Sequence, residues 1–281
     1  MNLIADSGST KTTWVLLDRG IVKKTVNTPG LNPYFHTSGS IRAILRADLV
    51  TELVADDVRQ IFFYGAGCST ENKNALLTEA MRDFFRHASI RIFHDILGAA
   101  RALLGKEPGI ACILGTGCNS CYYDGKEITT GVPSLGYIFG DEGAGSNIGK
   151  RFMEKYLKDK LPQDLKEEFQ QTYNLTLEDI LNSLYNLPYP NRFLASFSEF
   201  IAPRQSHPFL RDIVRSSLAD FFVEQVKKYD NYREVPVSFV GSIAHHYREI
   251  LLEVASVNKV NVGKVLQSPM EGLIEYHNNE Y

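Results

Sequence analysis

Blocks of hydrophobic residues alternate with small polar residues at the start of the chain. The apolar run Leu3–Ala5 is followed by a loop of small residues, Asp6–Thr12, and a second apolar run follows at Trp14–Leu17. β-Forming residues on both sides of a short loop are typical of a hairpin. We therefore predict two strands joined by the loop, with a return strand at Ile21–Val26.

The same unit recurs later in the chain. The apolar run Ile110–Leu114 leads into the small-residue loop Gly115–Asn119, and Cys121–Tyr123 then reaches Asp124-Gly125, which is a strong hairpin signal. Two copies of strand, small-residue loop, strand and acidic-Gly turn indicate a duplicated fold. We predict an α/β protein with two domains, residues 1–107 and 108–281.

Other segments show the spacing of helices or buried strands. In the first half we predict helices at 39–55, 71–86 and 96–104, and strands at 61–64 and 90–93. In the second half an amphipathic helix follows Gly145, and residues 162–230 are predicted to be helical. This region has a capping box at Thr176 and Asp179 and a long helix from Pro208 to Tyr229. A strand at 235–240, a helix at 247–257, a strand near 260–266 and a final helix opened by Ser268-Pro269 complete the expected elements.

The loop after the first strand suits phosphate binding. Small residues allow backbone N–H groups and hydroxyls to close around phosphate oxygens, and Asp6 is placed to hold a hydrated Mg²⁺ beside them. Ser9-Thr10-Lys11-Thr12 resembles the end of a P-loop, but that motif requires Gly where Thr10 stands and a helix directly afterwards. The P-loop interpretation is therefore rejected.

A second acidic residue lies where a strand gives way to a helix. Asp95 follows the strand at 90–93 and precedes the helix at 96–104. A carboxylate there can cap the helix or act as a general base. Between glycines, Asp141 and Glu142 precede another helix, where they can form a capping loop or a site loop.

Composition excludes several classes of protein. The chain has 281 residues, 44% of them hydrophobic and 22% charged, with a net charge of −3. These values are typical of a soluble globular protein and give no support to nucleic-acid binding. No apolar run approaches the roughly 20 residues of a membrane span, and the start lacks the charged and apolar parts of a signal peptide. We expect a cytoplasmic protein.

The cysteines and histidines give little sign of a metal site. Cys118 and Cys121 form a lone pair without a second pair or a nearby His cluster, so zinc is not expected. On a strand their side chains point to opposite faces, which argues against a disulfide. We expect cytosolic thiols, and helix-surface positions for His245 and His246.

With its loops in order, the sequence resembles the BadF/BadG/BcrA/BcrD ATPase family, in the branch that contains N-acetylglucosamine kinase. The resemblance covers nearly the whole chain. The motifs that carry it are Asp6–Thr12, Asn32-Pro33, Gly65–Gly67, Asp95, Gly115–Asn119, Gly140–Gly143 and Gly241-Ser242. It implies a duplicated ribonuclease H-like (actin-like ATPase) fold, with a helical insertion in the second domain and a nucleotide cleft between the domains.

The resemblance also implies roles for single residues. For ATP and its phosphates it implies Asp6, Gly8, Ser9, Thr10, Lys11, Thr12, Gly115, Thr116, Gly117, Gly241 and Ser242, with Mg²⁺ held by Asp6 through water. For the sugar it implies Asn32, Gly67, Asp95, Cys118, Asn119, Ser134, Leu135, Gly136, Tyr137 and Asp141. Asp95 matches the catalytic Asp of the family. Cys118 replaces a Ser of the family, and Leu135 stands where N-acetylglucosamine kinase has Trp.

The function implied is ATP-dependent phosphorylation of an amino sugar, such as N-acetylglucosamine, N-acetylmuramic acid or glucosamine. Phosphoryl transfer requires positioned phosphates, Mg²⁺ and a base for the acceptor hydroxyl, and the two loops, Asp6 and Asp95 can supply them. Two alternatives stay open: an ATPase that activates a dehydratase or reductase through an iron–sulfur cluster between subunits, and a non-catalytic sugar or nucleotide sensor. The resemblance allows a homodimer and implies no nucleic-acid or membrane partner.

Overall fold

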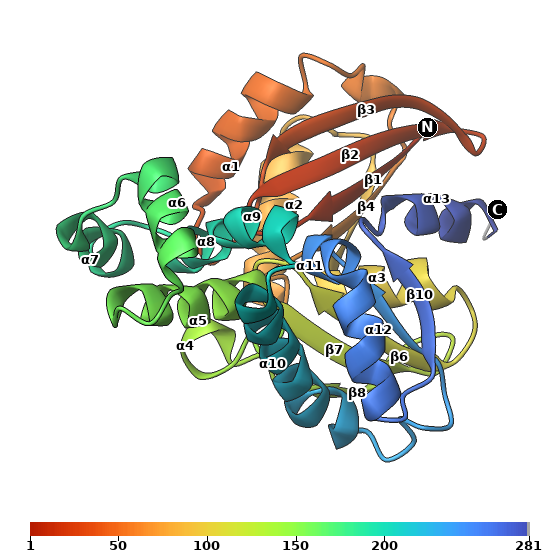
Figure 1. The fold of residues 1–281 in the computed structure, drawn as a ribbon. Helices are drawn as coiled ribbons and strands as arrows, with labels where there is room; N and C mark the ends of the chain where they lie inside the picture. The colour runs from red at the N-terminus through yellow and green to blue at the C-terminus, as the bar shows by residue number, and fades with distance from the viewer. Residues whose placement is uncertain (280–281) are drawn as a thin grey trace. The chain divides into compact units, whose positions relative to one another are not determined.

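The computed structural model describes residues 1–279 and divides the chain into two compact units (Figure 1). The first unit contains Met1–Glu107, the turn segment Tyr123–Ile128 and the part of the chain that follows Ser268. The second contains Pro108–Tyr122 and Thr129–Gln267. The last helix, α13 (Met270–Asn278), thus belongs to the first unit although it follows the second unit in the chain.

The first unit is built on a five-stranded sheet with the order β3-β2-β1-β4-β5. β1 pairs antiparallel with β2 and parallel with β4, and β4 pairs parallel with β5. The strands are β1 (Asn2–Ser7), β2 (Lys11–Asp18), β3 (Ile21–Pro29), β4 (Gln60–Gly65) and β5 (Ser89–His94). The helices are α1 (Ser38–Ile44), α2 (Glu71–Arg82), α3 (Asp95–Leu104) and α13 (Met270–Asn278), with short helical turns at Leu45–Leu49 and Ala55–Asp57.

Both faces of this sheet are buried. Successive side chains of a strand point to opposite faces, and Phe63 accordingly joins a cluster with Trp14 while Phe62 joins a cluster with Leu273 of α13. α3 and α13 pack together on the second of these faces. The sheet therefore holds the loop between β1 and β2, and the start of α3, on a rigid base.

The second unit repeats this topology. Its sheet has the order β10-β9-β6-β7-β8, so β8-β7-β6-β9-β10 corresponds to β3-β2-β1-β4-β5 of the first unit. The strands are β6 (Gly109–Leu114), β7 (Cys118–Tyr123), β8 (Ile128–Val132), β9 (Val237–Val240) and β10 (Val262–Leu266). The predicted α/β class and duplicated ribonuclease H-like fold are confirmed.

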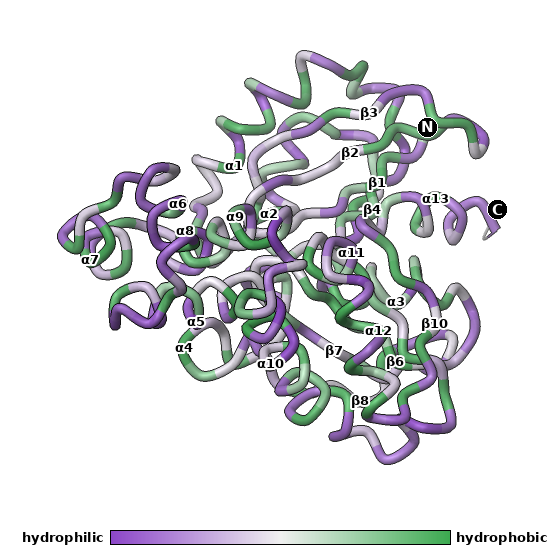
Figure 2. Tube along the Cα trace, in the orientation of Figure 1, coloured by the Kyte–Doolittle hydropathy of each residue, from purple (hydrophilic) through white to green (hydrophobic). Residues whose placement is uncertain are grey.

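A long helical stretch lies between β8 and β9. It comprises α4 (Gly136–Phe139), α5 (Gly145–Leu157), α6 (Gln163–Tyr173), α7 (Leu177–Tyr185), α8 (Pro190–Ser196), α9 (Ser198–Ile201) and α10 (Pro208–Glu224), with short turns at Ala202–Arg204 and Val226–Lys228. After β9 come α11 (Ser242–His246) and α12 (Arg248–Val257), and α10 packs beside α12. Figure 2 shows hydrophobic and hydrophilic residues alternating along these helices, as expected for helices with one buried face.

Several sequence predictions of local structure are confirmed, and two are wrong in their bounds. Thr176 and Asp179 form the expected capping box of α7, and His245 and His246 are exposed. The helix predicted at 39–55 ends at Val50, because β-branched Val50 and Thr51 favour helix poorly and Thr51 Oγ1 donates to the Ala47 carbonyl.

The long helix predicted to run from Pro208 to Tyr229 is also shorter than expected. α10 ends at Glu224, and Gln225 leaves the helix with its side chain bonded to Ser120. A polar contact with a strand of the sheet therefore competes with the last helical turn, and periodicity alone does not reveal such a contact.

All four cysteines are buried thiols. Burial raises the pKa of the Cys68 thiol to about 12 and raises the pKa of Cys112 and Cys118 well above the ordinary value. A raised pKa leaves little thiolate, which is the reactive form of cysteine. Within residues 1–279, no helix combines the length and hydrophobicity that crossing a bilayer would require.

Candidate active site

The loop between β1 and β2 is held by its own polar groups. The Ser7 and Thr12 hydroxyls are hydrogen-bonded at 2.8 Å, and the Gly8 N–H donates to the Lys11 carbonyl at 3.0 Å. The Leu31 N–H donates to Ser7 Oγ at 3.0 Å, which ties the next loop to this one. Gly8 and Thr10 remain exposed, so the loop presents small groups to a ligand.

Asp6 lies at the end of β1 beside this loop. Burial raises the pKa of its carboxyl to about 7, the nearby Asp95 carboxylate adds to that rise, and Lys11 opposes it. A partly buried carboxyl beside a second carboxylate is stabilised in its charged form by a cation. Asp6 therefore fits the expected role at a hydrated Mg²⁺, a cation that keeps several waters and binds few carboxylates.

Asp95 is the first residue of α3, not its N-cap. The cap is His94, whose Nδ1 accepts a hydrogen bond from the Ile96 N–H, so the capping interpretation of Asp95 is wrong. His94 Nδ1 also lies 2.6 Å from Asp95 Oδ1, and this buried oxygen has no other partner within residues 1–279. A carboxylate offers about four lone-pair sites, so Asp95 can accept from a ligand hydroxyl beside its contact with His94.

The environment of His94 shifts the pKa of its imidazole. Burial lowers the pKa of its imidazole, while the contact with the Asp95 carboxylate raises it, and the net direction is upward. The imidazole of His94, which can carry a positive charge, therefore lies beside Oδ1 of Asp95. The sequence spacing did not reveal this contact.

Asn32 and Gly67 meet in the same unit. Gly67 has φ +80°, and a Cβ at this position would lie 2.3 Å from Asn32 Oδ1. Both the backbone conformation and the space therefore require glycine. Asn32 Oδ1 accepts from the Tyr34 N–H at 2.9 Å, which fixes the orientation of the amide. The two residues, expected to contact sugar, form one rigid loop corner.

The second small-residue loop joins β6 to β7 in the second unit. The Gly115 N–H donates to the Gly117 carbonyl at 3.0 Å, and the carbonyls of Gly115 and Thr116 accept from the N–H groups of Gly145 and Ser146. These last two residues open α5. The loop is therefore fastened to a helix N-terminus, an arrangement that favours anions.

Asp141 is buried against this second loop. Its Oδ1 accepts from the Cys118 N–H at 2.9 Å, and Ser146 Oγ donates to Oδ2 at 3.5 Å. Burial raises the pKa of Asp141, the Cys118 hydrogen bond lowers it, and the net direction is upward. A Cβ on Gly117 would lie 2.9 Å from Oδ1, so the loop approaches the carboxylate more closely than any other residue would allow.

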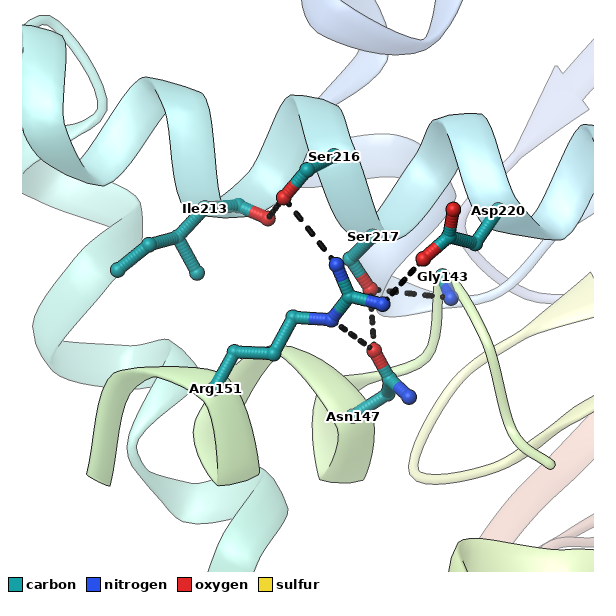
Figure 3. Close-up of polar contacts among 7 residues, drawn as sticks. All are labelled: Gly143, Asn147, Arg151, Ile213, Ser216, Ser217 and Asp220. Carbon is teal, nitrogen blue, oxygen red and sulfur yellow. Dashed lines mark hydrogen bonds and ion pairs between the residues drawn. The ribbon is translucent and has the colours of Figure 1, made fainter. Parts of the chain in front are cut away.

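A polar network supports the loop that carries Asp141. Figure 3 shows the Gly143 N–H donating to Ser217 Oγ (3.1 Å), and Ser217 Oγ donating to Asn147 Oδ1 (2.9 Å). Arg151 Nε donates to the same Asn147 oxygen at 2.7 Å. The guanidinium also contacts Ser216 and Asp220 of α10. Side chains of α5 and α10 therefore fix the acidic loop from behind.

The expected sugar-side segment 134–137 lies next to these loops. Ser134 Oγ donates to the Cys118 carbonyl at 3.4 Å, and Lys150 Nζ donates to the Tyr137 carbonyl at 3.0 Å. A cavity of about 650 Å³ is lined in part by Leu135, Gly140 and Glu142. The Leu135 side chain is 62% exposed. Gly136 opens α4 with φ +68°.

The expected adenosine loop follows β9. Gly241 has φ +126°, and a Cβ there would lie 2.2 Å from the Leu114 carbonyl oxygen. Gly241 therefore allows the end of β9 to lie directly against the end of β6, beside the second small-residue loop. Ser242 is exposed at the start of α11.

Each unit thus brings together its own share of the predicted residues. The first unit holds Asp6 to Thr12, Asn32, Gly67 and Asp95, and the second holds Gly115 to Asn119, Ser134 to Tyr137, Asp141, Gly241 and Ser242. The sequence interpretation missed Lys73, Asn147, Arg151 and Ser217, since their contacts join residues far apart in the chain. A cavity of about 750 Å³ that is lined by Met1, Arg19 and His277 contains none of the predicted residues.

Comparison with known proteins yields solved structures only. No family model matches the chain, and no curated protein does. A structure described as "Putative N-acetylglucosamine Kinase" from Porphyromonas gingivalis is 46% identical, with 99% of each chain covered and a TM-score of 0.95.

Two further structures are similar in fold. A structure described as "Putative N-acetylglucosamine Kinase" from Chromobacterium violaceum is 15% identical, with 98% of each chain covered and a TM-score of 0.77. A ROK hexokinase from Thermus thermophilus is 13% identical, with 98% of this chain and 97% of that chain covered and a TM-score of 0.52.

Proposed function

This chain belongs to the N-acetylglucosamine kinase-like family that the Porphyromonas gingivalis protein represents, and on that premise we propose that it is an ATP-dependent kinase of an amino sugar. The acceptor would be N-acetylglucosamine or a relative such as N-acetylmuramic acid or glucosamine. The observation that carries the proposal is the repetition of one loop. Asp6–Thr12 joins β1 to β2, and Gly115–Asn119 joins β6 to β7, in sheets of corresponding strand order.

Both loops are suited to phosphate. Each is built of small residues, is fixed by its own backbone hydrogen bonds and leaves N–H groups and hydroxyls for a ligand. We propose that Thr10 and Thr116 contact the phosphates of ATP and that Gly241-Ser242 receives the nucleoside. Mg²⁺, held by Asp6 through water, would neutralise charge on the β- and γ-phosphates.

Asp95 would act as the general base. The acceptor hydroxyl donates its proton to the Asp95 carboxylate, the hydroxyl oxygen bonds to the γ-phosphorus, and the bond from that phosphorus to the bridging oxygen of ADP breaks. Asn32, Asn119 and Asp141 would orient the sugar through its hydroxyls and acetamido group. Fixed groups of this kind supply the positioning on which phosphoryl transfer chiefly depends.

The activator alternative is less well supported. It requires cysteines that can reach a cluster shared with another subunit, whereas all four thiols of this chain are buried. A non-catalytic sensor would not need a carboxylate with the environment of Asp95.

The direct test is ADP release with MgATP and a panel of N-acetylglucosamine, N-acetylmuramic acid, glucosamine and glucose, followed by identification of the phosphorylated product. We expect sugar-dependent ADP release with at least one amino sugar, well above the rate with glucose. ATP hydrolysis at the same rate with and without every sugar would refute the kinase proposal. An iron assay and absorption spectrum of the purified protein test the activator.

A further inference from the structure

A lysine lies against the loop that carries Asn32. Lys73, on the first turn of α2, donates from Nζ to the Pro33 carbonyl at 3.1 Å. Its ammonium also lies 4.4 Å from the centre of the Tyr34 ring. The cation is therefore held on both residues that follow Asn32, within the first unit.

The charge of Lys73 has no acidic partner. Over residues 1–279, the contacts of its Nζ are the Pro33 carbonyl and the Tyr34 ring, with no carboxylate among them, and the side chain is half-exposed. An ammonium has three N–H donors, and the Pro33 carbonyl takes one. The N-terminus of α2, capped by Thr70, adds positive potential that Glu71 of the same turn partly offsets. An anionic group would thus find both a charge and free donors here.

Asn32, the residue before Pro33, offers a donor for a neutral oxygen. Because Asn32 Oδ1 accepts from the Tyr34 N–H, the amide group directs its NH₂ away from that contact, and in the described part of the chain this NH₂ has no protein partner. Gly67 packs under the amide and fixes its position. The loop therefore offers an amide donor, suited to a hydroxyl or ether oxygen, next to an ammonium donor, suited to an acid.

The ammonium is also held in place before any ligand arrives. The Tyr34 ring, itself 57% exposed, has its hydroxyl 3.4 Å from Ser69 Oγ. A cation fixed over an aromatic ring has lost much of its side-chain freedom, so less entropy remains to be lost on binding. A lysine that served only to solubilise the surface would not need this arrangement.

We propose that Lys73 recognises an anionic substituent of the acceptor, so that the substrate class of this site is amino sugars that carry a carboxylate. The inference rests on the proposed function, and it extends it from amino sugars in general to acidic ones. A neutral sugar is held through Asn32 alone, whereas an acidic sugar gains a charge-assisted hydrogen bond, which is roughly twice as strong as a neutral one.

The test compares one neutral and one acidic sugar in four variants. N-Acetylglucosamine and N-acetylmuramic acid share the acetamido ring and differ by a carboxylate-bearing ether. Lys73→Gln removes the charge and keeps a donor, Lys73→Met removes both, and Lys73→Arg keeps the charge. Lys126→Gln removes the same charge from an exposed turn and serves as the control. ATP-induced thermal stabilisation of each variant verifies folding.

We expect Lys73→Gln and Lys73→Met to lower kcat/KM for N-acetylmuramic acid by about tenfold to a hundredfold, which is the range of a charged hydrogen bond. The value for N-acetylglucosamine should change by less than about threefold, and Lys73→Arg should retain most activity on the acidic sugar. An equal loss on both sugars would make Lys73 a loop clamp only and overturn the inference, as would activity of the wild type on the neutral sugar alone. A wild type that releases no ADP with any sugar would refute the kinase proposal and this inference with it.

Discussion

The backbone N–H of Cys118 donates a 2.9 Å hydrogen bond to Oδ1 of Asp141. This bond joins the small-residue loop after β6 to the acidic loop before α5, two motifs that are separate in the sequence. Asp141 itself has φ +58°, a left-handed conformation that Asp tolerates better than most residues. Any ligand group placed by the second loop would therefore lie close to this carboxylate.

The first prediction concerns the general base. Asp95→Asn keeps the shape of the side chain but removes the proton acceptor, so kcat should fall by about 10²–10⁴-fold. Because His94 rather than Asp95 caps α3, thermal stability and ATP binding should stay close to wild type. Glu178→Gln, which neutralises an exposed acid in the first turn of α7, is the control. A stable Asp95→Asn variant with near-normal kcat would require another base, with Asp141 next to be tested.

The second prediction is that bulky side chains in the two phosphate loops weaken ATP binding. Thr10→Phe and Thr116→Phe should each raise the Kd for ATP by at least about tenfold, or about 1.4 kcal/mol, and affect sugar binding less. Thr25→Phe, at an exposed position of β3, controls for an added aromatic side chain. Isothermal titration with ATP measures the difference. If either loop variant folds and binds ATP normally, the two-loop interpretation fails.

Leu135 gives a test of sugar specificity that is independent of Lys73. The family has Trp at this position in N-acetylglucosamine kinase, and the smaller Leu removes a wall. Leu135→Trp should lower kcat/KM for N-acetylmuramic acid by about tenfold and leave N-acetylglucosamine nearly unchanged. Ile138→Trp adds the same bulk to a neighbouring exposed position as the control. Equal changes for both sugars, or none, would remove Leu135 from the sugar site.

The raised pKa of Asp6 predicts how the free energy of unfolding depends on pH. Its pKa is raised from 3.8 to about 7, so between these values the folded protein binds a proton that the unfolded chain releases. The free energy of unfolding of the metal-free protein should therefore fall as pH rises from about 4 to 7. The loss is at most about 4 kcal/mol, and smaller because the carboxyl keeps some exposure to water.

Asp6→Asn should remove this pH dependence. The amide stays neutral, so at pH 8 without Mg²⁺ the variant should be more stable than wild type in urea unfolding. Adding Mg²⁺ should stabilise only the wild type, and more at pH 8 than at pH 6. A wild-type protein whose stability rises steadily over this range would contradict the assigned environment of Asp6.

The network behind the acidic loop gives the last prediction. Ser217→Ala leaves the buried Gly143 N–H without its acceptor, at a cost of about 1–3 kcal/mol of stability. Arg151→Lys cannot hold Asn147, Ser216 and Asp220 together. Both should raise the KM for sugar by about threefold to tenfold with a smaller effect on the KM for ATP. Arg215→Lys, an exposed residue of α10 paired with Asp212, should behave as wild type.

Local patterns predicted much of the fold because each copy of the repeated hairpin is encoded within a short stretch of sequence. The apolar runs around Asp6 and Gly115 revealed both hairpins, and the capping box of α7 lies within four residues. The end of α10 could not be predicted, since it depends on the contact between Gln225 and Ser120. Periodicity reports a buried face, but it does not report which distant polar group competes for the last turn.

The residues of the candidate site likewise fall into those that local motifs predict and those that only distant contacts reveal. Asp6, Asn32 and Asp141 stand in short recognisable motifs, whereas Lys73 reaches Pro33 across 40 positions and Ser217 reaches Asn147 across 70. Such residues carry no local signal, because an isolated Lys or Ser on a helix is most often a surface residue. His94 could have been noticed as the sequence neighbour of Asp95. Its contact with that carboxylate, however, depends on α3 beginning at Asp95, with His94 as the N-cap.

The burial of all four native thiols makes this chain a convenient scaffold for chemical labelling. All four cysteines are at 5% exposure or less, and thiolate formation is suppressed at Cys68, Cys112 and Cys118. Maleimide reagents should therefore leave the folded wild type almost unmodified. A single cysteine introduced at exposed Lys23 in the first unit, or at exposed Val257 in the second, would then react alone. Fluorophores attached at the two positions would report by energy transfer on how the units respond to ATP and to each candidate sugar, with no native cysteine replaced.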